Sequence, residues 1–290
     1  MRNVKSVVYA FLIGGLFALV SQTLTTFWGY VLGEELELYV PCLTLISMGI
    51  IGFIMAGFAI YQYFIEWSGF GGILPFSGFA VGVGMTMLEP WFEGKSAGKS
   101  IWAGVFLLIW FNCIVALITV LIGVGCGMAG VTAESAPAVE GAIIFPLSYV
   151  GGGIMCAVFQ ALFILAKKIY KKCAPIHMLV FGWLMGAILA PTGFCTTMIH
   201  TFGQGFGIML PVGGYQMYNI GYLLAQGGAA ASEGVAMLGA FALAILGLFF
   251  TGLGTFLLYR ANFGRKTVEQ VHFERAQDQE KRYGAMVKGD

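Results

Sequence analysis

Long apolar runs separated by short polar segments dominate the pattern along this chain of 290 residues. A helix needs about 20 predominantly apolar residues to cross the roughly 30 Å hydrocarbon core of a bilayer. Runs of that length predict six membrane-spanning helices, near residues 8–29, 40–63, 101–126, 146–166, 177–199 and 235–259.

Two further apolar stretches are interrupted by glycines and a central proline. The first, GFGGILPFSGFAVGVGMTML, covers residues 69–88, and its core recurs 136 positions later, from Gly205 to Tyr215. Proline removes a backbone donor and glycine weakens a helix, so both stretches favour a broken helix over a smooth span. Broken segments at corresponding places in two halves are typical of a permeation or binding site.

The recurrence extends beyond the broken stretches. The segment from Gly14 to Gln22 aligns with the segment from Gly152 to Gln160, 138 positions later. We therefore expect two tandem repeat units. They occupy residues 10–126 and 146–259, with a linker loop at 127–145 and a charged cytoplasmic tail at 260–290.

The cationic residues predict how the units cross the membrane, because Lys and Arg in short loops favour the cytoplasm. Four crossings per unit would leave Lys95, Lys99 and the KKIYKK lysines outside. Three crossings per unit, with a re-entrant glycine-proline hairpin, place all 15 cations on one side together with both termini. An odd number of crossings inverts the second unit, so we expect an inverted repeat whose hairpins meet near the midplane.

Composition narrows the function classes. With 59% hydrophobic and 10% charged residues, the chain is more apolar than a soluble domain of this size needs, so we expect an all-α polytopic membrane protein. A net charge of +1 without a basic stripe predicts no nucleic-acid partner. The six cysteines form no CxxC pair and predict buried thiols. No nucleophile–base pair, metal-ligand spacing or phosphate loop is present, so we expect no enzyme, cofactor or metal site.

The hairpins are the expected site. Re-entrant backbone at membrane depth must be buried in protein or line a wet cavity, and the free N–H groups at the start of a half-helix favour an anion. The alternative is close packing of helices through small residues. The expected pore-lining residues of the hairpins are Glu66, Gly69, Gly71, Pro75, Ser77, Gly78, His200, Gln204, Gly205, Gly207, Pro211, Gly214, Tyr215, Gln216 and Asn219.

Gln22 and Gln160 complete the candidate set, because they occupy equivalent places in otherwise apolar helices. An amide in hydrocarbon is unfavourable unless it is hydrogen-bonded. Each glutamine therefore either ties the first helix of its unit to a hairpin or contacts the solute.

Glu66 also has two interpretations. An ionisable group within a membrane segment is a functional candidate, but its position would also let it reach the cytoplasmic interface. His177 and His272 stand apart from other candidate residues and are expected to do nothing specific.

These residues resemble a known family. The GGLxxxxxQ segment at 14–22 and the EWSGFGGILPFSGFA run at 66–80 resemble the SpoVAC/SpoVAE unit of the stage V sporulation membrane proteins. The matching residues are Gly14, Gly15, Gln22, Tyr61, Glu66, Pro75, Gly78 and Phe79 in the first half and Gly152, Gly153, Cys156, Gln160, Pro211, Gly214 and Tyr215 in the second. The chain departs from the family in fusing two units and in having Phe202 where the second glutamate would stand. The resemblance implies a role in moving dipicolinate, with its calcium, across a bacterial membrane.

Three functions follow as expectations. The first is a transporter or channel in the bacterial inner membrane for a small anionic solute, alone or with a divalent cation. The second is a mechanosensitive or osmotically gated pore, since hydrophobic constrictions can gate by dewetting. The third is a non-transporting scaffold subunit. The expected partners are the solute, the lipid bilayer, and other membrane subunits or further copies of the chain.

Overall fold

The computed structural model describes residues 2–207 and 209–287, and these residues form helices joined by loops. Six helical segments are long and apolar enough to cross a membrane, as the sequence predicts, and the chain is an all-α polytopic membrane protein. These segments are Asn3–Leu32, Glu34–Gly57, Ala97–Met128, Ile144–Ile169, Pro175–Thr192 and Gly228–Phe263.

The first half contains a broken hairpin between its second and third spans. The elements of this half are α1 (Arg2–Leu32), the 3₁₀ helix η1 (Glu34–Tyr39), α2 (Val40–Gly57), α3 (Tyr61–Ser68), α4 (Phe70–Ile73), α5 (Phe76–Phe92), α6 (Ala97–Trp110), the π-helical turn η2 (Phe111–Val115) and α7 (Ala116–Met128). The hairpin consists of α3, α4 and α5.

The second half repeats this order and adds a tail. Its elements are α8 (Ile144–Ile169), α9 (Pro175–Leu189), the 3₁₀ helix η3 (Ala190–Thr192), α10 (Phe194–Phe202), α11 (Gln204–Gly207), α12 (Leu210–Gln226), α13 (Gly228–Phe263) and the tail helix α14 (Val268–Val287). Here the broken hairpin consists of α10, α11 and α12.

The breaks occur where glycine permits a left-handed backbone. Gly69 separates α3 from α4 at φ +54°, and Gly203 separates α10 from α11 at φ +80°. The sequence repeat, with its offset of 136 positions, pairs Gly69 with Gly205. The two breaks in the structure, Gly69 and Gly203, are two positions closer together in the chain than this offset. Gly205 lies inside α11, so Gly203 fulfils the role that the alignment gave to Gly205.

The two prolines occupy different positions in their helices because the breaks are two positions closer together in the chain than the sequence repeat indicates. Pro75 is the N-cap of α5, whereas α12 is capped by Met209 and has Pro211 in its first turn. A proline is tolerated in either position because the N–H groups of the first turn have no partner within the helix.

The first helices of the two halves cross in antiparallel directions. Gly14 lies against Cys156 and Gly152 against Ala18, so residue numbers rise along α1 as they fall along α8. A Cβ atom on either glycine would overlap the opposite side chain. These small residues therefore allow the close approach of the two helices.

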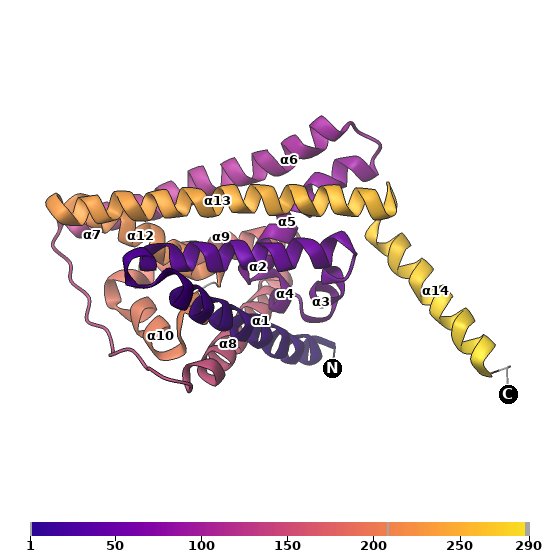
Figure 1. Cartoon of the computed structure of the whole chain (residues 1–290), viewed down its shortest axis with the longest axis horizontal. Helices are drawn as coiled ribbons and strands as arrows, with labels where there is room; N and C mark the ends of the chain where they lie inside the picture. Colours follow the sequence, from indigo (N-terminus) through magenta and orange to yellow (C-terminus); the bar gives the residue numbers. More distant parts are fainter. Residues whose placement is uncertain (1, 208, 288–290) are drawn as a thin grey trace.

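The two hairpins enter the bundle from opposite ends. Trp91 Nε1, at the end of the first hairpin, donates to Gly264 O at 2.8 Å, and Asn262 Nδ2 donates to Gly57 O at 3.1 Å. The second hairpin instead lies beside the linker, where Ala136 N donates to Thr197 Oγ1 at 3.2 Å. Figure 1 shows α13 running the length of the bundle, with α12 near one end and α14 at the other.

The tail helix is anchored on the joint between α2 and α3. Ala59 in this joint has φ +53°, and its carbonyl oxygen lies 3.0 Å from His272 Nε2 and 3.2 Å from Arg275 Nη1. The His272 ring stacks on Tyr63 with 3.8 Å between ring centroids. The expectation that His272 does nothing specific is wrong, because the fold brings together residues more than 200 positions apart.

Candidate functional site

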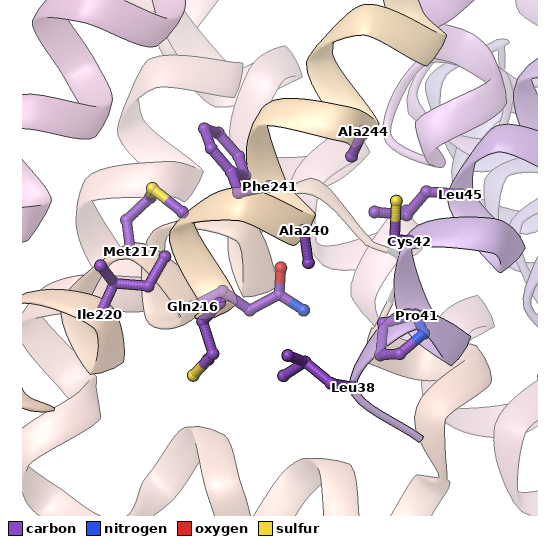
Figure 2. Close-up of a pocket in the computed structure, with 11 residues that line it drawn as sticks. Leu38, Pro41, Cys42, Leu45, Gln216, Met217, Ile220, Ala240, Phe241 and Ala244 are labelled. Carbon is purple, nitrogen blue, oxygen red and sulfur yellow. The ribbon is translucent and has the colours of Figure 1, made fainter. Parts of the chain in front are cut away.

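A cavity lies between α2, α12 and α13 and continues to the place where the two hairpins meet. We call it the vestibule and define it by three adjoining pockets that share Leu45 and Gln216. The largest of these three pockets has a volume of about 150 Å³ and is lined by Leu38, Pro41, Cys42, Leu45, Gln216, Met217, Ile220, Met237, Ala240, Phe241 and Ala244. In Figure 2 the amide of Gln216 extends from α12 into the space between Ala240 and Leu38.

The vestibule narrows toward the hairpins. Its inner pocket has a volume of about 30 Å³ and is lined by Leu45, Phe76, Phe79, Asn112, Trp183, Gly207, Met209, Gly213, Gln216, Phe241, Ala244, Ile245 and Leu248. A side pocket of about 10 Å³ is lined by Thr25, Pro41, Leu45, Gln204, Gly207 and Gln216. None of these lining residues carries a charge.

Two half-helices begin at this inner end. Pro75 and Met209 form an antiparallel bridge, and α5 and α12 start immediately after them and run for 17 residues each. Phe76, Met209 and Gly213, from these starts, line the inner pocket. The N-terminus of a helix carries a partial positive charge, so both half-helices favour a negative group at this end of the vestibule.

The paired glutamines hold the hairpins of the opposite halves. Gln22 Oε1 accepts hydrogen bonds from Gly205 N at 2.8 Å and from Ser148 Oγ at 3.2 Å. Gln160 Oε1 accepts from Phe70 N at 3.0 Å. The antiparallel crossing of α1 and α8 places each glutamine beside the break of the other half. Neither glutamine is among the residues that line the vestibule pockets.

Among the other expected residues, the second hairpin supplies the contacts with the vestibule. Gln204, Gly207 and Gln216 line it. Tyr215 Oη instead lies 2.8 Å from Thr196 Oγ1, and His200 Nδ1 lies 2.6 Å from Ala136 O in the linker. Of the remaining residues of this hairpin, Gly205 packs against α1, Gly214 packs against Trp183, and Asn219 is half-buried on α12. Pro211 is in the first turn of α12.

The expected residues of the first hairpin lie in packed surroundings or on the surface. Ser77 Oγ is 2.8 Å from Tyr61 Oη, and a Cβ on Gly71 would lie 2.8 Å from Ala10 Cα. Gly69 packs against Gln160, Gly78 packs against the backbone of α4, and Pro75 forms the bridge with Met209. Glu66 is exposed, and its Oε1 lies 3.1 Å from His272 Nδ1. In this conformation the first hairpin contributes Phe76 and Phe79 to the vestibule instead.

Sequence reasoning missed Asn112, which lines the inner pocket from the third span of the first half. A signal was present, since Asn112 is the one amide in the apolar run 101–126. The same argument that singled out Gln22 and Gln160 applies to it. The apolar lining residues, such as Leu45 and Phe241, have no comparable signal because their neighbours in sequence are equally apolar.

Comparison with models of protein families gives a match over the first half of the chain. Residues 6–131 match the model of the family described as SpoVAC/SpoVAEB sporulation membrane protein. The matched region covers α1 to α7, and over it the resemblance to this family is confirmed. No curated protein and no solved structure matches the chain.

Proposed function

We propose that this protein, whose first half matches the SpoVAC/SpoVAEB sporulation membrane proteins, is a membrane transporter or channel for a small anionic solute. Dipicolinate or its calcium complex is the solute that the family resemblance suggests. The observation that carries the proposal is the vestibule, which ends where two broken hairpins from opposite ends of the bundle meet.

The chemistry of the vestibule supports passage of a solute. Its outer pocket of about 150 Å³ is several times the roughly 30 Å³ that a water molecule occupies in the liquid. Gln204 and Gln216 supply amides that can bind a polar solute. The starts of α5 and α12 favour a negative group without a cationic side chain that would hold the solute tightly.

The inner end of the vestibule is closed by apolar side chains. Phe79 packs on Phe111 with 5.0 Å between ring centroids, and Phe111 packs on Trp183 at 5.2 Å. Passage therefore requires the hairpins to move. The breaks at Gly69 and Gly203 are suitable hinges because glycine tolerates large changes in backbone dihedrals.

The orientation follows from charge. Leu38, at the outer end of the vestibule, belongs to η1, which also contains Glu34, Glu35 and Glu37. With the 15 cations in the cytoplasm, η1 lies on the opposite side. In this conformation the vestibule is thus open to the outside and closed toward the cytoplasm.

The aromatic closure favours a second candidate function, a pore that opens under membrane tension. A constriction lined by apolar residues excludes water when it is narrow and conducts once it widens. The walls formed by Phe76, Phe79, Trp183 and Phe241 suit such a gate.

Solute flux into reconstituted vesicles tests both functions. We expect purified protein to release entrapped pyridine-2,6-dicarboxylate faster than protein-free vesicles do, with and without equimolar calcium. Release at constant osmolarity supports a transporter or an open channel, whereas release only after a hypo-osmotic shift supports the tension-gated pore. A folded protein that releases no solute under either condition would contradict both functions and favour a scaffold subunit.

A further inference from the structure

The third span of the first half is interrupted by one π-helical turn. The turn comprises Phe111–Val115 and joins α6 to α7. No other π-helical turn occurs in residues 2–207 and 209–287. The corresponding span of the second half, α13, continues for 36 residues without such a turn. Because π-helical turns are unfavourable and frequently occur at functional sites, the residues that this one positions are candidates for function.

The turn positions an amide with a free acceptor. Asn112 Nδ2 donates to Leu108 O at 2.9 Å, which fixes the amide orientation because the reverse would place two oxygens together. Asn112 Oδ1 is buried and has no hydrogen-bond partner among the described residues. A buried acceptor without a partner is unfavourable, so a ligand or water that donates to it would be stabilised.

The free oxygen belongs to a residue that lines the inner pocket, beside the starts of α5 and α12. The other buried polar atoms without a described partner are Ser21 Oγ, Gln62 Oε1 and Ser100 Oγ, and none of these residues lines the vestibule pockets. The inner pocket, at about 30 Å³, is large enough for a water molecule or the leading group of a solute. Asn112 is therefore an acceptor at the inner end of the vestibule.

The surroundings hold this acceptor in place, and Gln216 supplies the other amide that lines the inner pocket. Phe111 is fully buried between Phe79 and Trp183, which locks the turn. From the side of α13, Ala244 and Leu248 line the same pocket and offer no polar atom of their side chains. The half-helix starts provide donors for a carboxylate, and Asn112 provides the complementary acceptor.

We propose that Asn112 is a specificity-determining residue that accepts a hydrogen bond from the solute at the inner end of the vestibule. Among small carboxylates, the path then favours those that also carry an O–H or N–H donor; the pyridine-2,6-dicarboxylate dianion has no such donor and passes without this contact. This inference rests on the proposed transport function and adds to it the chemical class of the preferred solute.

Paired solutes in reconstituted vesicles test the inference. We would measure release of pyridine-2,6-dicarboxylate and of its 4-hydroxy derivative, which keeps both carboxylates and adds a donor. We expect wild-type protein to favour the hydroxy derivative about tenfold, as one hydrogen bond allows. Asn112→Leu should reduce this ratio to about one. Asn112→Ala, which removes the acceptor without adding volume, provides the same test if the leucine variant does not fold.

Cys113→Leu is the matched control, because Cys113 lies in the same turn and is exposed; it should keep the wild-type preference. The ratio of the two rates isolates recognition from a general loss of activity. An unchanged ratio in a folded Asn112→Ala variant that still moves solute overturns this inference alone. Wild-type protein that moves neither solute overturns the inference together with the proposed function.

Discussion

Gln22 in the first helix accepts a hydrogen bond from the backbone N–H of Gly205, at 2.8 Å, in the hairpin of the other half. In the second half, Gln160 likewise accepts a hydrogen bond from Phe70 N, at 3.0 Å, in the hairpin of the first half. Each half of the chain thus stabilises the broken hairpin of the opposite half. The glutamines also lie against Gly203 and Gly69, the two breaks, where a side chain would collide with the amide.

The first prediction concerns these amides. Gln22→Leu removes the acceptor for Gly205 N and leaves this group buried without a partner, whereas Ser148 Oγ keeps its hydrogen bond to Phe202 O. We expect a loss of about 1–3 kcal/mol in the free energy of unfolding, measured as a lower melting temperature of the purified protein. Thr23→Leu, next to it on the exposed side of α1, is the control and should melt near the wild type. Equal melting of both variants would contradict a structural role for Gln22.

The second prediction concerns the crossing of α1 and α8. A Cβ at Gly14 would overlap Cys156, whereas a Cβ at Gly29 in the same helix would meet nothing within 4 Å. We expect Gly14→Val to destabilise the protein by about 1–3 kcal/mol through overpacking, or to prevent folding. Gly29→Val should be nearly neutral. Similar yields and melting temperatures for the two variants would show that α1 and α8 do not pack as described.

The sequence predicts the six spans and the two breaks because these depend on local properties, namely the length of apolar runs and the conformational preferences of glycine and proline. The correspondence of the breaks depends on which glycine adopts a positive φ. The sequence repeat pairs the break at Gly69 with Gly205, whereas in the structure the glycine with positive φ is Gly203. Contacts between distant segments, such as His272 with Ala59 and Glu66, have no local signature and require the fold. The vestibule likewise depends on gaps between side chains that belong to several helices.

The third prediction concerns the tail helix. Arg275 donates to Phe58 O at 2.6 Å and to Ala59 O at 3.2 Å, in a joint that holds a left-handed alanine. We expect Arg275→Ala to lower the free energy of unfolding by about 1–3 kcal/mol. Lys266→Ala removes only the exposed ion pair with Glu274 and should cost less than about 1 kcal/mol. The two melting temperatures provide the comparison, and an equal loss in both variants would contradict the anchoring role of Arg275.

The fourth prediction concerns topology. Cysteines introduced at Lys95 or Lys168 should react with a membrane-impermeant thiol reagent only from the cytoplasm. Cysteines at Glu35 or Glu134 should react only from outside. The protein without an introduced cysteine measures the background from the native thiols. Labelling of the lysine positions from outside would rule out three crossings per half and restore four.

The central claim is that the solute passes through the vestibule, and one pair of glycine variants tests it most directly. A Cβ at Gly207 would approach only Gln204 Oε1, at 3.3 Å, so leucine there extends into the vestibule without a backbone clash. Gly125, on the exposed side of α7, has nothing within 4 Å and provides the matched control. In vesicles loaded with pyridine-2,6-dicarboxylate, we predict that Gly207→Leu abolishes release while Gly125→Leu releases at the wild-type rate. Release at the wild-type rate from a folded Gly207→Leu protein would contradict the claim and place the path elsewhere.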